Sequence, residues 1–134
     1  MLKLENPAIS NKVERELIEK LATKFCFDIS PTKKMARFDG IDNKNKVLVE
    51  CKNRSNTYNK YPTTMIGADK IAYWKSKYPD FTLYFCVNFT DGAFYYKWDN
   101  EEEIKIAEGG RCDRGKQELK DYCYVPIELL NKLD

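Results

Sequence analysis

The chain has 134 residues, of which 43% are hydrophobic and 33% charged, with a formal net charge of +2 and no histidine. This length suits one domain whose core needs neither disulfides nor a structural metal, so we expect residues 1–134 to form a single domain. Without histidine, Ser-His-Asp and Cys-His relays are excluded, and a Cys/His zinc site is not expected. Acid-base or metal chemistry must therefore use carboxylates, lysines or tyrosines, and binding of nucleic acid must rest on a local basic patch.

The sequence has no apolar run of the ~20 residues that span a bilayer, and its start lacks the apolar core of a signal peptide. We therefore expect no membrane partner and a cytoplasmic location, in a cell or in a host cell if the source is a virus. The five cysteines lie far apart and form no C-x-x-C pair. In a reducing compartment they are expected to be free thiols.

Apolar periodicity and turn residues predict the elements of secondary structure. In chain order, these are a helix over Asn11–Phe25, a short strand over Phe25–Ile29, a hairpin of strands Met35–Ile41 and Lys46–Lys52, a polar loop over Asn53–Pro62, a helix over Thr63–Tyr78, a hairpin of strands Phe81–Phe89 and Ala93–Trp98, an acidic turn over Asn100–Glu103, a loop over Gly109–Lys116, a strand near Tyr122–Val125 and a terminal helix over Pro126–Leu133. This order predicts an α/β (α+β) architecture, with a central mixed β-sheet flanked by helices.

The first predicted hairpin carries the residues that indicate chemistry. With the turn centred at residues 43–44, Asp39 is expected opposite Leu48, and Glu50 and Lys52 share the face of Leu48. Asp39 then lies diagonally from Glu50, at about 7–8 Å, so that both carboxylates can converge on one ion. A slip of one residue in this register would move Asp39 to the opposite face and remove the convergence.

Hard oxygen ligands of this kind suit Mg²⁺ or Mn²⁺. Asp39 and Glu50 are the predicted metal ligands, and the backbone carbonyl of Cys51 is a further candidate. Such an ion polarises a phosphodiester and lowers the pKa of a bound water, while Lys52 would hold that water or neutralise developing charge. An exposed, salt-bridged strand face would show the same Glu-x-Lys pattern, so the upstream Asp39 is essential to the functional interpretation.

These residues resemble the motif of the PD-(D/E)XK nuclease superfamily, which has the restriction-endonuclease-like fold. In that motif an aspartate ends one strand, and an acidic residue, any residue and a lysine follow on the next strand. Asp39 fills the first position and Glu50-Cys51-Lys52 the others, whereas Phe38 stands where the name-giving proline would be. The resemblance implies a metal-dependent nuclease with Asp39, Glu50 and Lys52 as its catalytic residues.

The resemblance also implies two supporting residues. Members often carry an additional glutamate on the first helix, for which the candidates are Glu14, Glu16 and Glu19; we select Glu16 because it neighbours the apolar stripe. Lys70 lies about where the superfamily places a helical polar residue that supports the site. A solvated helix surface is the alternative interpretation of all four side chains.

Basic and aromatic residues follow the proposed site. The predicted contacts to nucleic acid are Arg54, Tyr58, Lys70, Arg111 and Arg114. Tyr58, like its neighbour Tyr61, either stacks on bases or covers the core. Arg111 and Arg114 lie in a glycine-containing loop and either grip adjacent phosphates or pair with nearby acids.

The leading hypothesis is therefore a metal-dependent endonuclease that hydrolyses phosphodiester bonds of double-stranded or branched DNA. Junction resolvase and nicking enzyme are candidate types, and a homodimer is expected because one site cuts one strand. The alternative is a non-catalytic nucleic-acid-binding domain of the same fold. A structural or interaction protein whose charged hairpin is only surface is the third hypothesis.

Overall fold

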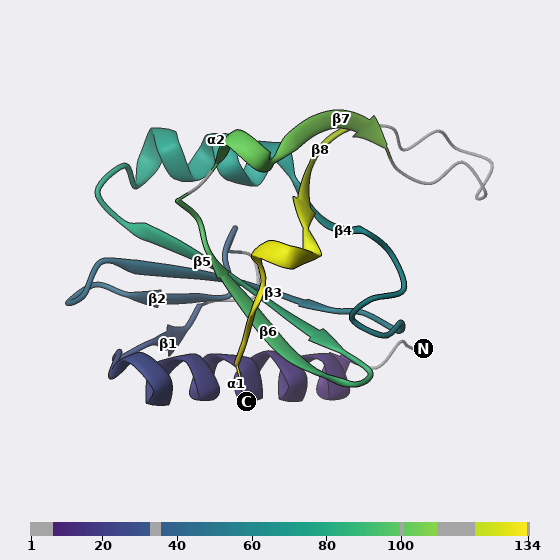
Figure 1. Cartoon of the computed structure of the whole chain (residues 1–134). Coiled ribbons are helices and arrows are strands. Elements are labelled where there is room, and N and C mark those ends of the chain that lie inside the picture. Colours follow the sequence, from purple (N-terminus) through teal and green to yellow (C-terminus); the bar gives the residue numbers. More distant parts are fainter. Residues whose placement is uncertain (1–6, 33–35, 100, 110–119, 134) are drawn as a thin grey trace.

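The computed structural model describes residues 7–32, 36–99, 101–109 and 120–133. Within these ranges, two β-sheets and two α-helices form the molecule (Figure 1). The elements are α1 (Pro7–Phe25), β1 (Ser30–Pro31), β2 (Gly40–Asp42), β3 (Val47–Asn53), β4 (Thr63–Gly67), α2 (Ala68–Lys77), β5 (Thr82–Phe89), β6 (Gly92–Lys97), the 3-10 turn η1 (Glu101–Glu103), β7 (Lys105–Gly109), β8 (Lys120–Pro126), the 3-10 turn η2 (Ile127–Leu129) and β9 (Asn131–Lys132).

The larger sheet has the order β1-β2-β3-β5-β6-β9, and its central pair, β3 and β5, is parallel. Parallel neighbours need a long crossover connection, which β4 and α2 occupy here. The other described pairings of this sheet are antiparallel. A smaller antiparallel sheet, β4-β8-β7, completes the structure. The predicted class, a mixed sheet flanked by helices, is confirmed.

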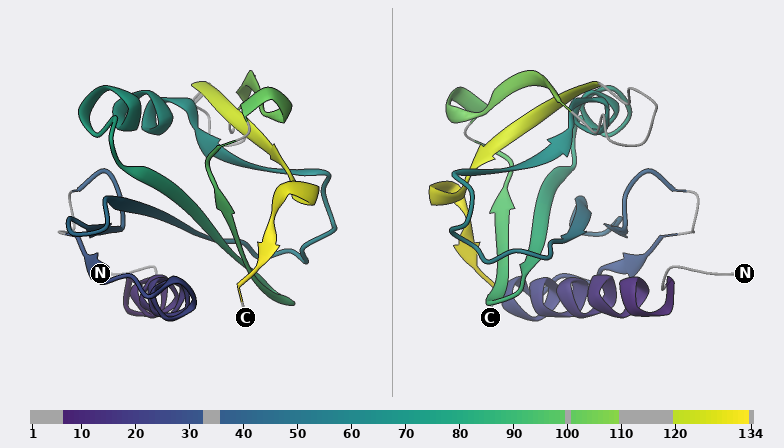
Figure 2. Two further views of the ribbon diagram at one scale, coloured as in Figure 1. Left: turned by 60° about the vertical axis from the view of Figure 1, so that its left-hand side comes forward. Right: turned by 90° about the vertical axis from the view of Figure 1, so that its right-hand side faces the viewer.

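Side-chain alternation along β3 and β5 produces two cores, one on each face of the larger sheet. On one face, Leu17, Ile18 and Leu21 of α1 pack against Val47 and Val49. The opposite face is covered by α2 and the smaller sheet (Figures 1 and 2). The central strands are therefore buried on both sides, and polar groups can reach solvent only near strand ends. None of the helices in the described ranges combines the length and the apolar character that crossing a membrane would need.

The helix predicted over Thr63–Tyr78 is wrong in its first third. Residues 63–67 form β4, which pairs with β8, and the helix begins at Ala68. Two threonines and an isoleucine favour a strand, and Thr64 and Ile66 are buried while Met65 between them is less so. This period of two could have been recognised in the sequence.

Other element boundaries also differ from the prediction. Residues 25–29 form no strand: Cys26 ends α1 with φ of 60°, and β1 follows at Ser30. The terminal helix is only the short η2, followed by β9, and β7 was not predicted at all. β1 and β9 have two residues each, and β7 is exposed along most of its length, so none of them shows an apolar period and tertiary pairing decides their conformation.

Candidate active site

Asp39 lies where the pairing of β2 with β3 ends. Gly40 is the residue opposite Val49, and the N–H of Asp39 also donates to the carbonyl of Val49 at 2.9 Å. Two successive residues therefore oppose one, which is the pattern of a β-bulge. The Asp39 carboxylate accepts a hydrogen bond from the N–H of Cys51 at 2.8 Å. The bulge thus turns this side chain to the edge of β3, where it replaces a backbone acceptor.

The predicted register of this hairpin is wrong by two residues. Ile41, and not Asp39, is the partner of Leu48. A shift of two residues does not exchange the faces of a strand, since side chains alternate with a period of two. Asp39 lies beyond this ladder, where the bulge directs its side chain, and its carboxylate is close enough to Glu50 to raise the pKa of Glu50.

Glu50, in the middle of β3, is a buried acid. Its side chain is 3% exposed and pairs with two ammonium groups, Nζ of Lys70 at 3.1 Å and Nζ of Lys52 at 3.5 Å. Burial raises the pKa of Glu50 and the Asp39 carboxylate raises it further; Lys70 and Lys52 offset this only in part, so the pKa is about 7 instead of 4.5. An additional cation nearby would stabilise the ionised form of this carboxylate and lower its pKa.

Lys70 reaches Glu50 from the first turn of α2. Its ammonium group also donates to the backbone carbonyl of Arg37 and lies 5.8 Å from the centre of the Phe38 ring. These contacts join α2 to the segment that precedes β2. The structure therefore places Lys70 inside the site, beside Glu50, and not on an outlying basic surface.

Helix α1 adds a third acid, Glu14. Together with Lys52, it lines a hollow of about 240 Å³ at the end of β3. Burial raises the pKa of Glu14, the Asp39 carboxylate raises it further, and Lys52 and Lys70 lower it. These five residues form one electrostatic unit, which we call the acid–lysine cluster: Glu14, Asp39, Glu50, Lys52 and Lys70.

The glutamate selected from the sequence, Glu16, lies elsewhere. It is exposed and lines a separate surface hollow, with Leu133 on the opposite side. The signal that singles out Glu14 is its spacing, because it precedes the buried Leu17 by three residues and Ile18 by four. Residues at these separations share one face of a helix. Glu16 lies directly beside Leu17 in the sequence, which turns it away from that face.

Cys51 presents its backbone, and not its sulfur, to the cluster. The side chain is buried against α1, and burial raises the pKa of the thiol so that it stays protonated. Its N–H points toward Asp39. The N–H and C=O of one residue in an extended strand point to the same edge. The carbonyl of Cys51 therefore lies at the edge that Asp39 occupies.

This geometry agrees with a comparison of the chain with models of protein families. A family model described as "Phage putative PDDEXK endonuclease" matches residues 7–133. The chain belongs to this family. The resemblance to the PD-(D/E)XK superfamily is thereby confirmed, and the two-sheet architecture is its restriction-endonuclease-like fold. A comparison with curated proteins gave no match.

PDDEXK endonucleases typically use a divalent metal ion. The question is therefore whether the metal-ligating atoms of this site suit such an ion. Among the described residues, no three His, Cys, Asp or Glu side chains are grouped as a ready-made metal cage. The donors at the edge of β3 are instead two carboxylates, Asp39 and Glu50, and the carbonyl of Cys51. Mg²⁺ retains several waters and is usually bound by only one or two carboxylates, so this all-oxygen set fits it.

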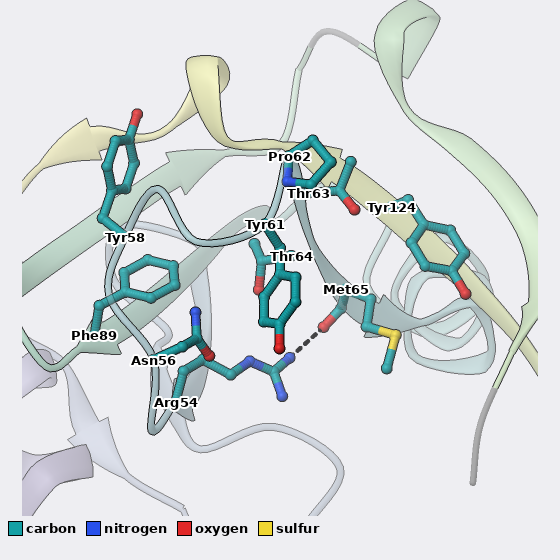
Figure 3. A pocket seen from close by; sticks show the side chains of 10 residues that line it. All are labelled: Arg54, Asn56, Tyr58, Tyr61, Pro62, Thr63, Thr64, Met65, Phe89 and Tyr124. Atoms are coloured by element: carbon teal, nitrogen blue, oxygen red, sulfur yellow. Dashed lines mark hydrogen bonds between the residues drawn. The ribbon is translucent and has the colours of Figure 1, made fainter. Parts of the chain in front are cut away.

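The predicted nucleic-acid contacts of this PDDEXK protein have different surroundings. Tyr58 is part of the fold: its ring stacks on Phe94 at 4.2 Å, and its hydroxyl donates to the carbonyl of Ile127. It covers the core, which was the alternative interpretation. Arg54 follows β3 and faces a pocket (Figure 3). Arg111 and Arg114 lie outside the described residues.

Proposed function

We propose that this PDDEXK family member is a metal-dependent endonuclease that hydrolyses phosphodiester bonds of DNA at the acid–lysine cluster. The observation that carries the proposal is the convergence of Asp39 and Glu50 with the ammonium group of Lys52 at the free edge of β3. Mg²⁺ or Mn²⁺ is the proposed cofactor, held by Asp39, Glu50 and the carbonyl of Cys51. When bound, it would polarise the phosphodiester and supply a more acidic water.

The protein groups have separate tasks in this proposal. Lys52 is about one-third exposed, and its ammonium can hold the attacking water or donate to a phosphate oxygen as negative charge develops. Glu14, which lines the same hollow, can accept a proton from that water, because its raised pKa makes it a better base than an exposed glutamate. Lys70 holds Glu50 in place through its hydrogen bond to Oε1.

The finer parts of the proposal follow from the same site. One cluster cuts one strand, so a break through both strands requires a homodimer or two successive nicks, and we propose nicking or junction resolution. The thiols of Cys26, Cys51, Cys86 and Cys123 are free, as expected in the cytoplasm. We also propose that residues 1–134 act as one nuclease domain, since the family match covers nearly all of them.

The test is cleavage of supercoiled plasmid and of branched DNA in the presence of Mg²⁺ or Mn²⁺. We expect the wild type to cut, and Lys52→Ala to lose activity by roughly 10²–10³-fold, the usual effect of removing one group that stabilises the transition state. Lys97→Ala, which removes an exposed ammonium on β6, is the charge-matched control and should cut normally. Equal activity of the wild type and Lys52→Ala would mean another site or a contaminant.

A second measurement separates the endonuclease from a binding domain of the same fold. Calorimetric titration with Mn²⁺ should show binding to the wild type and weaker binding to Asp39→Ala. A protein that binds DNA, takes up no metal and cuts none of the substrates would be the non-catalytic alternative. Cleavage of RNA in place of DNA would preserve the chemistry and change the substrate.

A further inference from the structure

A pocket of about 340 Å³ begins just beyond the catalytic strand. It lies between the segment that follows β3 and the smaller sheet, with Arg54 on one side and Met65 and Tyr124 on the other (Figure 3). Its exposed lining is mainly apolar, and no aspartate or glutamate is among its lining residues. At this volume, it is near the lower end of small-molecule sites. It would suit one flat, uncharged group beside an anion.

Arg54 provides the anion-binding side of this pocket. Its guanidinium is partly buried and donates from Nη2 to the carbonyl of Met65 at 2.7 Å. Burial lowers the pKa of Arg54, and no carboxylate in the described part of the chain is paired with it. A partly desolvated cation without a counter-charge attracts an anion, and the remaining N–H groups of the guanidinium can bind a phosphate.

Two tyrosines provide the flat surfaces. Tyr61 is 53% exposed, and its ring extends into the pocket beside the Arg54 guanidinium (Figure 3). Tyr124 pairs with Lys105 in the ladder, yet a Cβ at Gly109 would overlap its hydroxyl. The Tyr124 side chain is therefore directed toward β7, and the glycine leaves room for its hydroxyl. Tyr124 also lines the pocket, so its ring is available for stacking there.

The chain leads directly from the acid–lysine cluster to the pocket, because Arg54 follows Asn53, the last residue of β3. Glu50, Lys52 and Arg54 are alternate residues, and alternate residues of an extended strand lie about 6.6 Å apart on one side. A phosphate at Lys52 and a neighbouring phosphate at Arg54 could therefore belong to one strand of nucleic acid. The base attached to that strand would then lie at the mouth of the pocket.

We propose that this pocket receives an unpaired base of the strand being cut, with Arg54 on the adjacent phosphate and Tyr61 and Tyr124 against the base. The inference rests on the proposed nuclease function and specifies its substrate: DNA with an unpaired nucleotide next to the cleavage position, as in a flap, bulge or branch. A paired base must first be extruded from the duplex, which costs free energy that an unpaired base does not. The pocket thereby makes the enzyme selective for DNA structure and not for sequence.

Binding without cleavage tests the pocket directly. Duplexes of identical sequence, with and without one unpaired 2-aminopurine, are titrated with protein in EDTA, and base fluorescence is recorded. We expect quenching and tighter binding only for the unpaired base, and a loss of about tenfold in affinity for Tyr61→Ala. Tyr61→Phe, which keeps the ring, should restore binding. Ile106→Ala, an exposed apolar change on β7 outside the pocket, is the control.

Three results would overturn the inference. The first is equal affinity for duplexes with and without the unpaired base, and the second is an unchanged affinity of Tyr61→Ala. The third is that free dAMP displaces the DNA as effectively as a competing DNA strand does, which would make the pocket a site for free nucleotides. Cleavage assays with Mg²⁺ keep the two proposals distinguishable. If no DNA is cut while the unpaired base still binds and quenches, the nuclease function fails and the pocket stands. If all duplexes are cut equally and Tyr61→Ala has no effect, the pocket fails and the nuclease function stands.

Discussion

Two buried acids of the same hairpin, Asp42 and Glu50, are satisfied in opposite ways. Asp42 is 1% exposed and accepts hydrogen bonds from three backbone N–H groups, of Asp28, Lys44 and Asn45, and from the Asn45 side chain. These bonds lower its pKa despite its burial. Glu50 is equally buried, but it accepts from no backbone group among its described contacts and lies near a second acid, which raises its pKa.

The contrast indicates a structural role for Asp42 and a chemical role for Glu50, although both acids belong to one pair of strands. Backbone donors stabilise the ionised form of Asp42 permanently, because they are fixed by the turn itself. Glu50 depends on two side-chain ammonium groups instead of backbone donors, so an arriving cation or phosphate can change its ionisation. Changes at Asp42 should therefore act on stability, and changes at Glu50 on activity.

The largest expected effect is that of Glu50→Gln. The amide keeps the shape but cannot carry the charge that would hold a cation, so we expect DNA cleavage to fall by roughly 10²–10³-fold or more. The melting temperature at neutral or higher pH should stay equal or rise, because the raised pKa of Glu50 means that its ionised form destabilises the folded state. Cleavage rates and thermal melts on the same preparation check both parts. If Glu50→Gln lowered the melting temperature and the folded protein still cut DNA at the normal rate, Glu50 would have a structural role and not a catalytic one.

Lys70→Met should have the next largest effect. The change keeps the length of the side chain but removes the ammonium that binds Glu50 and the carbonyl of Arg37. We expect a 10–100-fold loss of activity, typical of residues that orient a metal ligand. Weaker Mn²⁺ binding by calorimetry should accompany it. Lys77→Met, at the exposed end of the same helix, provides the control; an equal loss in both would indicate a general effect of charge.

Asp42→Ala should give the opposite profile. It leaves the donors of Asp28, Lys44 and Asn45 without their acceptor, which we expect to cost about 2–3 kcal/mol in the free energy of unfolding. Cleavage per folded molecule should remain near that of the wild type. Urea unfolding followed by tryptophan fluorescence, combined with rates at low temperature, measures the two quantities. A loss of activity without a loss of stability would contradict the structural role.

The smallest effect is a dependence of the Asp42 contribution on pH. The pKa of Asp42 in the folded state lies below its ordinary value of 3.8, so the stabilisation is complete above that value and is lost as the pH falls through the folded-state pKa. The difference in unfolding free energy between the wild type and Asp42→Asn should therefore shrink at acid pH. A constant difference from neutral pH down to about pH 2 would show that ionisation of Asp42 is not the cause.

The chemistry of the site was readable from the sequence because it depends on residue type and on short-range alternation. The absence of histidine is a matter of composition, and the acid-x-lysine pattern of Glu50 and Lys52 and the apolar run of β3 lie within a few neighbouring positions. They predicted a mixed sheet, an oxygen-rich site and the superfamily. The register error of two residues left the faces of β2 unchanged, but the position of Asp39 was not decided by this ladder.

Tertiary structure decided which distant residues meet. The bulge at Asp39, the selection of Glu14 and the enclosure of Tyr58 depend on contacts with residues far away in the chain. β4 is an intermediate case: its period of two is visible in the sequence, and pairing with β8 about 60 residues later stabilises the strand. Local propensities cannot encode such contacts, because their free energy comes from packing and from backbone partners that exist only in the folded chain.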